Sequence, residues 1–433
     1  MRKRVAMAVA VLGACGLAGA AIVHNNKPGA IVSVVSLDDP PTDVTVDARS
    51  GRAVVTAQPE AIVAAQLGTI RTWVLDPRDG RVTATRVESN PSYFCHGYVL
   101  DHWPNMGPLT TPCARAVMAS TPQDTVTHRA FLTGVEYVVV VDTRTGAAVA
   151  PEVDVFSQPQ DPLVNEQIHR AYISIGSNKP GGQTMWVWDT RSGRVLAVVG
   201  FQGLPSTPLV AVRTNRVFVP VHDDISFPPL DRIYTLDTRT NLVRQMVVLR
   251  RGPGVYGVMW AGVAARANHV FAIEEHGSVV SYDKVGTVFM LDASGGAIIH
   301  SVDIGLNPLM GAVDDRRGLV YILSRGSLST LPDTTYTDGV DAPVGAGSVS
   351  VLDAASGLLL HTIPVGVDPH GLAVDERMGH VIVVAGGGTI DVPDADPWAW
   401  APGWLRQRLP FMARPAHHWR HIKPTVTFLD ATN

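Results

Sequence analysis

Two short patterns in the sequence have residue types and spacings that could support chemistry. His417, His418 and His421 have the one-turn spacing of two metal ligands on one helical face. No glutamate completes an HExxH pattern beside them, so we interpret them as solvated side chains and predict no metal site there. The segment 252–257 reads GxGxxG without the strand-turn-helix context of a dinucleotide site, so we interpret its glycines as turn residues.

A wider set of polar residues follows apolar strands in the second half of the chain. Its members are His222, Asp223, Asp224, Arg250, Glu274, Glu275, His276, Arg325, Asp368 and His370. Carboxylates and imidazoles gathered in one place could hold a cation or a small polar ligand. Such residues are also common in solvated loops, which is the alternative interpretation. We predict no cofactor, and a divalent cation such as calcium is the alternative.

The stretch 391–423 is rich in tryptophan and arginine. It holds four of the nine tryptophans of the chain. The residues predicted to contact a partner are Trp398, Trp400, Trp404, Arg406, Arg408, Phe411 and Trp419. Tryptophan and arginine are typical of interface hot spots and also of the headgroup region of a membrane. Partner contact and a lid packed over the channel are equal alternatives here, ahead of membrane contact.

The N-terminal residues 1–23 have the pattern of an export signal or membrane anchor. Three basic residues precede an uncharged run that extends from Val5 to Val23. The segment 12–15 reads as a lipobox in which Cys15 would be acylated, and the segment 18–20 reads equally as an ordinary cleavage site. An uncleaved run of this length could also span a bilayer. All three alternatives place the remainder in the cell envelope, periplasmic or extracellular, behind a linker at 24–30.

Cysteine usage is consistent with export. Cys95 and Cys113 remain in the body of the chain, and an oxidising compartment favours a disulfide bond between them. Two buried free thiols are the alternative.

One hairpin phrase recurs seven times and indicates the fold. Two apolar residues precede an aspartate, then small or polar residues lead to a glycine or asparagine. The aspartates are Asp76, Asp142, Asp189, Asp237, Asp292, Asp353 and Asp430. Alternating apolar residues predict a strand, the aspartate accepts backbone N–H bonds, and glycine or asparagine supplies the positive φ of a tight turn. Two further strands follow a proline-marked turn, so each unit is a four-stranded meander, one blade of a β-propeller.

The two ends of the chain predict how the ring closes. The last unit stops after its third strand at 425–429, and an orphan strand at 31–37 precedes the first unit. Pairing these two strands removes both exposed sheet edges. We therefore predict an all-β fold in which residues 31–433 form a seven-bladed propeller of four-stranded antiparallel blades, closed by an N-terminal outer strand in the last blade.

The segment 349–385, VSVLDAASGLLLHTIPVGVDPHGLAVDERMGHVIVVA, resembles the YVTN-repeat family of bacterial propellers. It has the V-x-V-x-D-x-x-x-G hairpin followed by V-G-x-x-P-x-G and an apolar strand. The family's Tyr-Val-Thr-Asn quartet is loosened, for example to VYILS at 320–324, and long loops follow it. The resemblance implies an exported propeller with WD40-like blades.

With strands a to d numbered from the centre outward, the b–c and d–a connections share the top face, where the long loops and the polar set fall. Loops lengthened on one face predict a binding surface. We therefore expect a non-enzymatic envelope platform that binds a protein or a small polar ligand. We expect no nucleic-acid partner, because the net charge of the chain is −4. We expect a monomer that meets the membrane through its N-terminal anchor. The alternatives are a lactonase-like hydrolase, the large subunit of an amine-dehydrogenase-like enzyme, and a purely structural wall component.

Overall fold

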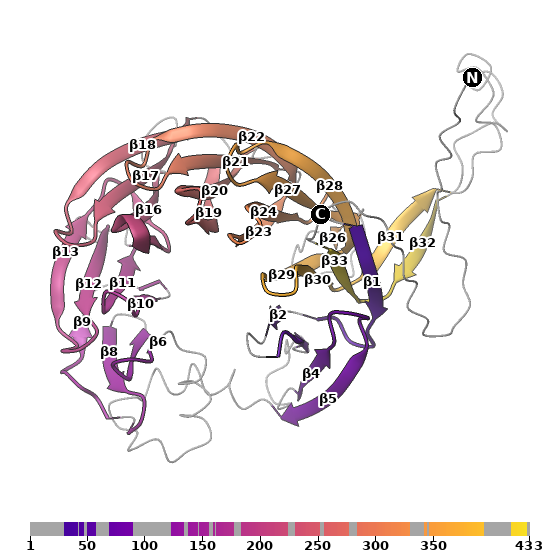
Figure 1. Ribbon diagram of the computed structural model, residues 1–433, viewed down its shortest axis with the longest axis horizontal. Coiled ribbons are helices and arrows are strands. Elements are labelled where there is room, and N and C mark those ends of the chain that lie inside the picture. Colours follow the sequence, from indigo (N-terminus) through magenta and orange to yellow (C-terminus); the bar gives the residue numbers. More distant parts are fainter. Residues whose placement is uncertain are drawn as a thin grey trace.

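The computed structural model describes most of the propeller. The described residues are 30–41, 43–46, 50–57, 69–89, 123–133, 137–145, 147–155, 159–160, 162–176, 183–223, 230–251, 255–276, 284–329, 342–343, 346–393 and 417–430. Their strands form seven antiparallel sheets arranged around one axis, as predicted (Figure 1). Within these ranges no helix is long and apolar enough to cross a membrane.

The first three blades follow the chain in order from the centre outward. Blade 1 is β2 (Asp43–Val46), β3 (Ala53–Ala57), β4 (Thr69–Leu75) and β5 (Val82–Ser89). Blade 2 is β6 (Gln123–Asp124), β7 (Arg129–Thr133), β8 (Tyr137–Asp142) and β9 (Val153–Asp154). Blade 3 is β10 (Leu163–Asn165), β11 (Arg170–Ile175), β12 (Thr184–Asp189) and β13 (Val195–Gly200).

The next three blades keep the same order. In blade 4, β14 (Leu204–Pro205) and β15 (Leu209–Ala211) share the inner position before β16 (Arg216–Asp223), β17 (Leu230–Asp237) and β18 (Val243–Arg251). Blade 5 is β19 (Val255–Ala264), β20 (His269–His276), β21 (Val285–Asp292) and β22 (Ile298–Leu306). Blade 6 is β23 (Pro308–Asp314), β24 (Leu319–Ser324), β27 (Ala346–Asp353) and β28 (Leu359–Val367).

Blade 7 closes the ring with a strand from the other end of the chain. Its inner strands are β29 (Pro369–Asp375), β30 (His380–Ala385) and β33 (Thr425–Asp430). The outer strand is β1 (Ala30–Ser36), which pairs antiparallel with β33 from Ala30 opposite Asp430 to Ser36 opposite Thr425. The predicted closure is therefore confirmed, with the strand beginning one residue earlier than expected.

The core lies between neighbouring blades. The six residues of β24 are all buried, because both faces of this strand are covered by the adjacent sheets. One apolar cluster joins Trp73 and Leu75 of blade 1 to Ile382 and Phe428 of blade 7. Outer strands instead alternate between partly buried and exposed residues, as in β13. Each blade thus buries its apolar faces only against its neighbours.

The hairpin turns follow the predicted chemistry. In blade 6, the Oδ1 atom of Asp353 accepts hydrogen bonds from the Ser356 N–H (2.7 Å) and the Ala355 N–H (3.1 Å). Gly357 then adopts a φ of 75°. The inner a–b turns also contain a left-handed residue, which the sequence pattern did not predict. Each of these seven turns has one left-handed residue: Gly51, His128, His169, Asn215, Asn268, Gly318 and Gly379.

The two turns of a blade are also hydrogen-bonded to each other. The N–H of Thr190 donates to the carbonyl of His169 (3.0 Å), and the N–H of Ala354 donates to the carbonyl of Gly318 (2.8 Å). In each case the donor follows a hairpin aspartate and the acceptor is the left-handed residue of the a–b turn. These turns form the bottom face of the ring.

Ring closure depends on β1. Deleting residues 31–37 should abolish cooperative thermal unfolding, because it exposes the edge of β33 and the cores on both sides of blade 7. Removing residues 1–23 alone is the matched control and should leave the melting temperature unchanged. Calorimetry distinguishes the two, and an unchanged melting temperature after the deletion of 31–37 would contradict this closure.

The aspartate turn of blade 6 should contribute measurable, pH-dependent stability. The Ser356 hydroxyl and the backbone N–H groups hold the pKa of Asp353 below its usual value, which stabilises the fold above the unfolded pKa and is lost as the pH falls. Asp353→Ala should lower the free energy of unfolding by about 1–2 kcal/mol at pH 7, and by less in acid. Asp353→Asn keeps one acceptor and should cost less at pH 7. Denaturant titrations measure both, and an equal loss at both pH values would argue against the carboxylate.

Candidate functional site

Five residues of the polar set lie at the top ends of two b strands rather than in loops. His222 and Asp223 are the last residues of β16, and Glu274, Glu275 and His276 end β20. Both strands extend into the segments expected to be loops, because they stay paired with the next strand up to their last residue. Asp223 is opposite Leu230 of β17, and His276 is opposite Val285 of β21. A strand end holds its side chains in a fixed register, which a loop does not.

The best-defined contact in this set joins His222 to Asp231. The two residues are directly opposite each other on β16 and β17, and the Nδ1 atom of His222 lies 2.6 Å from the Oδ1 atom of Asp231. An ionised carboxylate can only accept, so Nδ1 carries the hydrogen and Nε2 is the acceptor of the neutral ring. The pair therefore orients the imidazole and sets its tautomer.

Asp231 has a second oxygen that the described residues do not satisfy. The residue is 0% exposed, and its Oδ2 atom has no hydrogen-bond partner. A buried carboxylate oxygen without a donor is costly, and such atoms commonly mark a bound water, ion or ligand.

Asp231 and His222 line a cavity of about 360 Å³ between blades 3, 4 and 5. Its polar lining residues are Gln160, Ser206, His222, Asp231 and Glu275, and its apolar lining residues are Leu204, Pro205, Val221, Val258 and Met259. The walls come from the starts of the inner strands and the ends of the b strands, so the cavity opens at the top of the central channel. This size and mixed lining suit a small molecule.

Glu275 adds a titratable group to the same wall. Burial raises the pKa of its carboxyl, while the positive charges of Lys284 and Arg325 act in the opposite direction. Burial makes the ionised form of this carboxyl unfavourable, and a positively charged neighbour stabilises that form. The cavity therefore favours a ligand with positive charge or several hydrogen-bond donors.

A second cluster continues from Glu275 toward blade 7. Asp368, between β28 and β29, has a φ of 53°. It accepts from His370 Nε2 at 2.9 Å and lies 3.4 Å from Arg325 Nε. Since Arg325 also acts on Glu275, the structure brings His222, Glu275, Arg325, Asp368 and His370 into one arc along the top of the channel.

Two predicted ligand residues do not join this arc. Asp223 is buried and pairs with Arg232, whose Nη1 atom lies 2.9 Å from its Oδ2 atom. It follows His222 directly in a strand, so its side chain points to the opposite face of the sheet. Glu274 is separated from Glu275 in the same way and is 0% exposed. The structure therefore places Asp223 and Glu274 on the other side of their strands from His222 and Glu275, and a ligand contact of these two residues stays a prediction.

Several predicted residues lie outside what the structure describes. They are Cys15, Cys95, Cys113, Asp224, Trp398, Trp400, Trp404, Arg406, Arg408 and Phe411. Arg250 lies on β18, and Trp419 lies on β32, without described side chains. The disulfide and the lipidation stay predictions.

The described ends of the tryptophan-rich stretch form a hairpin. β31 (Gly388–Pro393) pairs with β32 (His417–Ile422), and this hairpin projects outward from the ring beside blade 7 (Figure 1). These two strands therefore do not cover the channel. A helical one-turn spacing for the three histidines is excluded, since they lie on a strand, and no group of three possible metal ligands occurs among the described residues. A second small hairpin, β25 (Leu328–Ser329) with β26 (Ala342–Pro343), interrupts blade 6.

Sequence reasoning missed three residues and misassigned one. Asp231 and Ser206 were overlooked, although an aspartate inside the apolar strand Leu230–Asp237 is itself a signal of a buried polar contact. Asn307 was also missed: its backbone and side chain bond to Lys284, Arg325 and Gly326. Gly257 is not a turn residue but lies in β19, where the pairing with β20 is irregular, with a φ of 114°.

The His222–Asp231 pair should show strong coupling. His222→Phe should lower the free energy of unfolding by about 2–4 kcal/mol, because it leaves a buried charge without its donor. His222→Phe combined with Asp231→Leu should recover more than half of that loss. Denaturant titrations of the wild type, both single variants and the double variant measure the coupling. Additive losses would show that the two side chains do not act as a pair.

No protein-family model and no curated protein matches the chain. Among solved structures, Kuenenia stuttgartiensis hydrazine synthase is similar over 81% of this chain and 94% of that chain, with 13% sequence identity and a TM-score of 0.46. A similarity of this size carries no argument about function, and the propeller assignment depends on the strand pairing described above.

Proposed function

We propose that this chain is an exported propeller of the YVTN type that binds a small polar ligand in the cavity at the top of its channel. The observation that carries the proposal is the buried Oδ2 atom of Asp231, which lines that cavity and has no hydrogen-bond donor among the described residues. A ligand ammonium or hydroxyl group would satisfy it. Glu275 lines the same cavity, so the preferred ligand carries at least one positive charge.

The proposed location in the cell envelope has separate support. The basic residues and the uncharged run at 1–23 have the pattern of an export signal, and the family resemblance of 349–385 is to exported propellers. A binding function without chemistry agrees with the notable lack of a complete GxSxG, CxxCH or Walker motif in the sequence. A protein partner at the long top-face loops is compatible with the same role.

A hydrolase is the second candidate, and one observation favours it. His222 and Asp231 lie on the paired strands β16 and β17 of blade 4, Ser206 directly follows β14 of the same blade, and all three line one cavity. The imidazole is already oriented by the carboxylate, as a general base must be. Hydrolysis of small esters or lactones that Ser206→Ala abolishes would support this candidate over simple binding.

Ligand binding should depend on the ionisation of Glu275. A cationic ligand found by thermal-shift screening of amines and amino sugars should bind less tightly as the pH falls through the raised pKa of Glu275. Glu275→Gln should bind more weakly at neutral pH, by about tenfold, and should lose that pH dependence. Calorimetry across pH measures both. Asp315→Asn, on the bottom face, is the matched control and should bind normally. Screening that yields only anionic or apolar ligands would overturn the proposal.

A further inference from the structure

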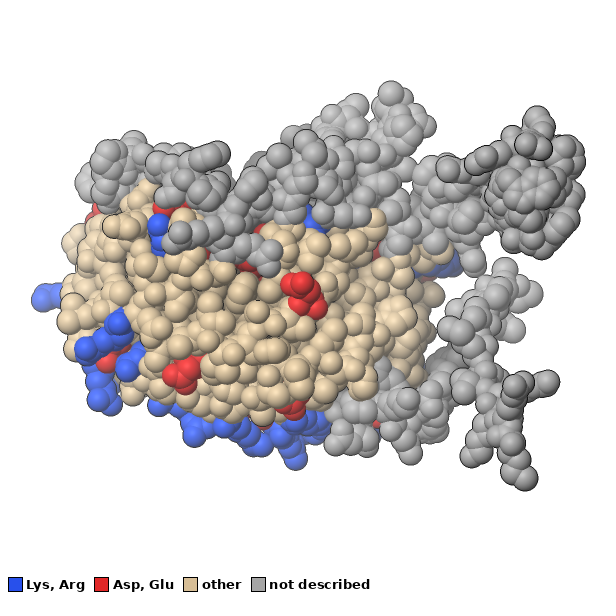
Figure 2. Space-filling model, turned by 90° about the horizontal axis from the view of Figure 1, so that it is seen from above, with Lys and Arg blue, Asp and Glu red and all other residues tan. Residues whose placement is uncertain are grey.

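The bottom face carries a dense set of exposed arginines. Among the described residues, its hairpin turns and adjoining strand ends present twelve exposed arginines but two exposed carboxylates, Asp79 and Glu376. The hairpin aspartates are held in their turns by backbone N–H groups, as Asp353 is. Figure 2 views the ring from its edge and shows basic side chains gathered along the lower edge. The uneven charge contrasts with the net charge of −4 for the whole chain.

Most of these arginines are not committed to ion pairs. The side chains of Arg78, Arg81, Arg191, Arg194 and Arg239 in the c–d turns form no salt bridge with described residues. The same holds for Arg52, Arg316 and Arg377 in the a–b turns. Eight arginines from five blades therefore lie on one side of the ring without an ion pair to any described residue.

Large apolar side chains border the same face. Leu242, Ile299 and Leu358 follow c–d turns at the start of the outer strands and are 61%, 50% and 55% exposed. Val126, in the a–b turn of blade 2, is 64% exposed. Arginines interspersed with exposed leucine, isoleucine and valine are typical of surfaces that lie in the headgroup region of a membrane.

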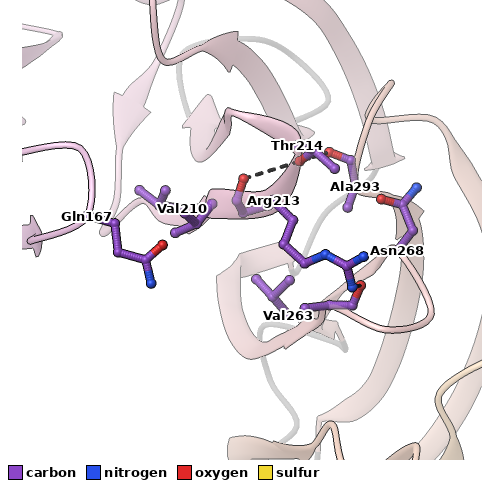
Figure 3. Close-up of a pocket in the computed structure, with 10 residues that line it drawn as sticks. Gln167, Val210, Arg213, Thr214, Val263, Asn268 and Ala293 are labelled. Atoms are coloured by element: carbon purple, nitrogen blue, oxygen red, sulfur yellow. Dashed lines mark hydrogen bonds between the residues drawn. The ribbon is translucent and has the colours of Figure 1, made fainter.

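The bottom face also has a recess between blades 4 and 5. Its volume is about 250 Å³, and its lining includes Gln167, Val210, Arg213, Val263 and Asn268. Figure 3 shows the Arg213 side chain reaching across this recess. The Nη1 atom of Arg213 donates to the carbonyl of Ala265 (2.7 Å), which holds the guanidinium in place. A fixed guanidinium in a small recess suits a phosphate group.

The first described strand, β1, enters the fold at this face. Ala30 lies opposite Asp430, the aspartate of the seventh hairpin, so β1 begins at the bottom face. If residues 1–23 anchor the protein, which is part of the proposed function, the short linker at 24–30 holds the arginine-bearing side toward the bilayer.

We propose that the bottom face binds the surface of an anionic phospholipid membrane, with the arginines on lipid phosphates and the exposed leucines and isoleucines among the headgroups. Phosphate charge explains the arginines, and a lipid surface, unlike a soluble polyanion, also accommodates the apolar border. The top cavity then faces away from the membrane.

Vesicle co-sedimentation of the chain without residues 1–23 tests this directly, because no anchor contributes. We expect binding to phosphatidylcholine vesicles that contain about one third phosphatidylglycerol, little binding to pure phosphatidylcholine, and release by salt. Replacing Arg78, Arg81, Arg191, Arg194 and Arg239 by glutamine should weaken binding at least tenfold, and replacing them by lysine should retain most of it. Unchanged melting temperatures of both variants would verify the fold.

The remaining variants separate a lipid surface from other anionic partners. The double variant Leu242→Ser with Leu358→Ser should weaken vesicle binding and leave binding to soluble polyphosphate unchanged. Among single arginine changes, only Arg213→Gln should weaken vesicle binding. No binding to anionic vesicles, or binding that the five glutamines leave intact, would overturn the proposal. If the arginine changes reduce vesicle binding and polyphosphate binding equally, and the leucine changes reduce neither, the face binds a soluble polyanion instead. None of these outcomes depends on the top cavity, so failure here leaves the proposed ligand site standing.

Discussion

Face-to-face stacking of the blades is the constraint on which the rest of the structure depends. The middle strands of a blade are apolar on both faces, as the fully buried β24 shows, so a blade cannot expose either face to water. Each apolar cluster accordingly takes residues from two neighbouring blades. An open stack of blades would expose an apolar face at each end, and closing the stack into a ring covers both of these faces. β1 completes that closure by pairing with β33.

Closure also determines where side chains can meet. The chain crosses between the same two faces of the ring in every blade, so the strand ends gather on these faces and each face receives its own class of connection. The a–b and c–d turns, short and stabilised by aspartates and left-handed residues, form the bottom face. The longer connections form the top face. A polar residue at a strand end is therefore held at one mouth of the channel by the same packing that forms the core.

The two faces differ in what they can recognise. At the top, His222, Asp231 and Glu275 line a small cavity that opens to the channel, and His222 is paired with the buried Asp231. Such a site favours a small ligand with matching donors. At the bottom, the arginines are exposed and spread over several blades, which favours a broad anionic surface. One ring can carry both functions because the apolar core between the blades separates the two faces.

The sequence by itself determined the number of blades, the closure and the turn chemistry, because each depends on local patterns. Seven aspartate phrases mark seven hairpins, and an orphan strand at one end matches a missing strand at the other. It also located the top-face residues His222, Glu275, Arg325, Asp368 and His370. Only the tertiary structure decided which of them meet. Asp223 and Glu274 alternate to the other side of their strands, and Asp231 pairs with His222 across a sheet, because these contacts depend on register and on neighbouring blades rather than on spacing along the chain.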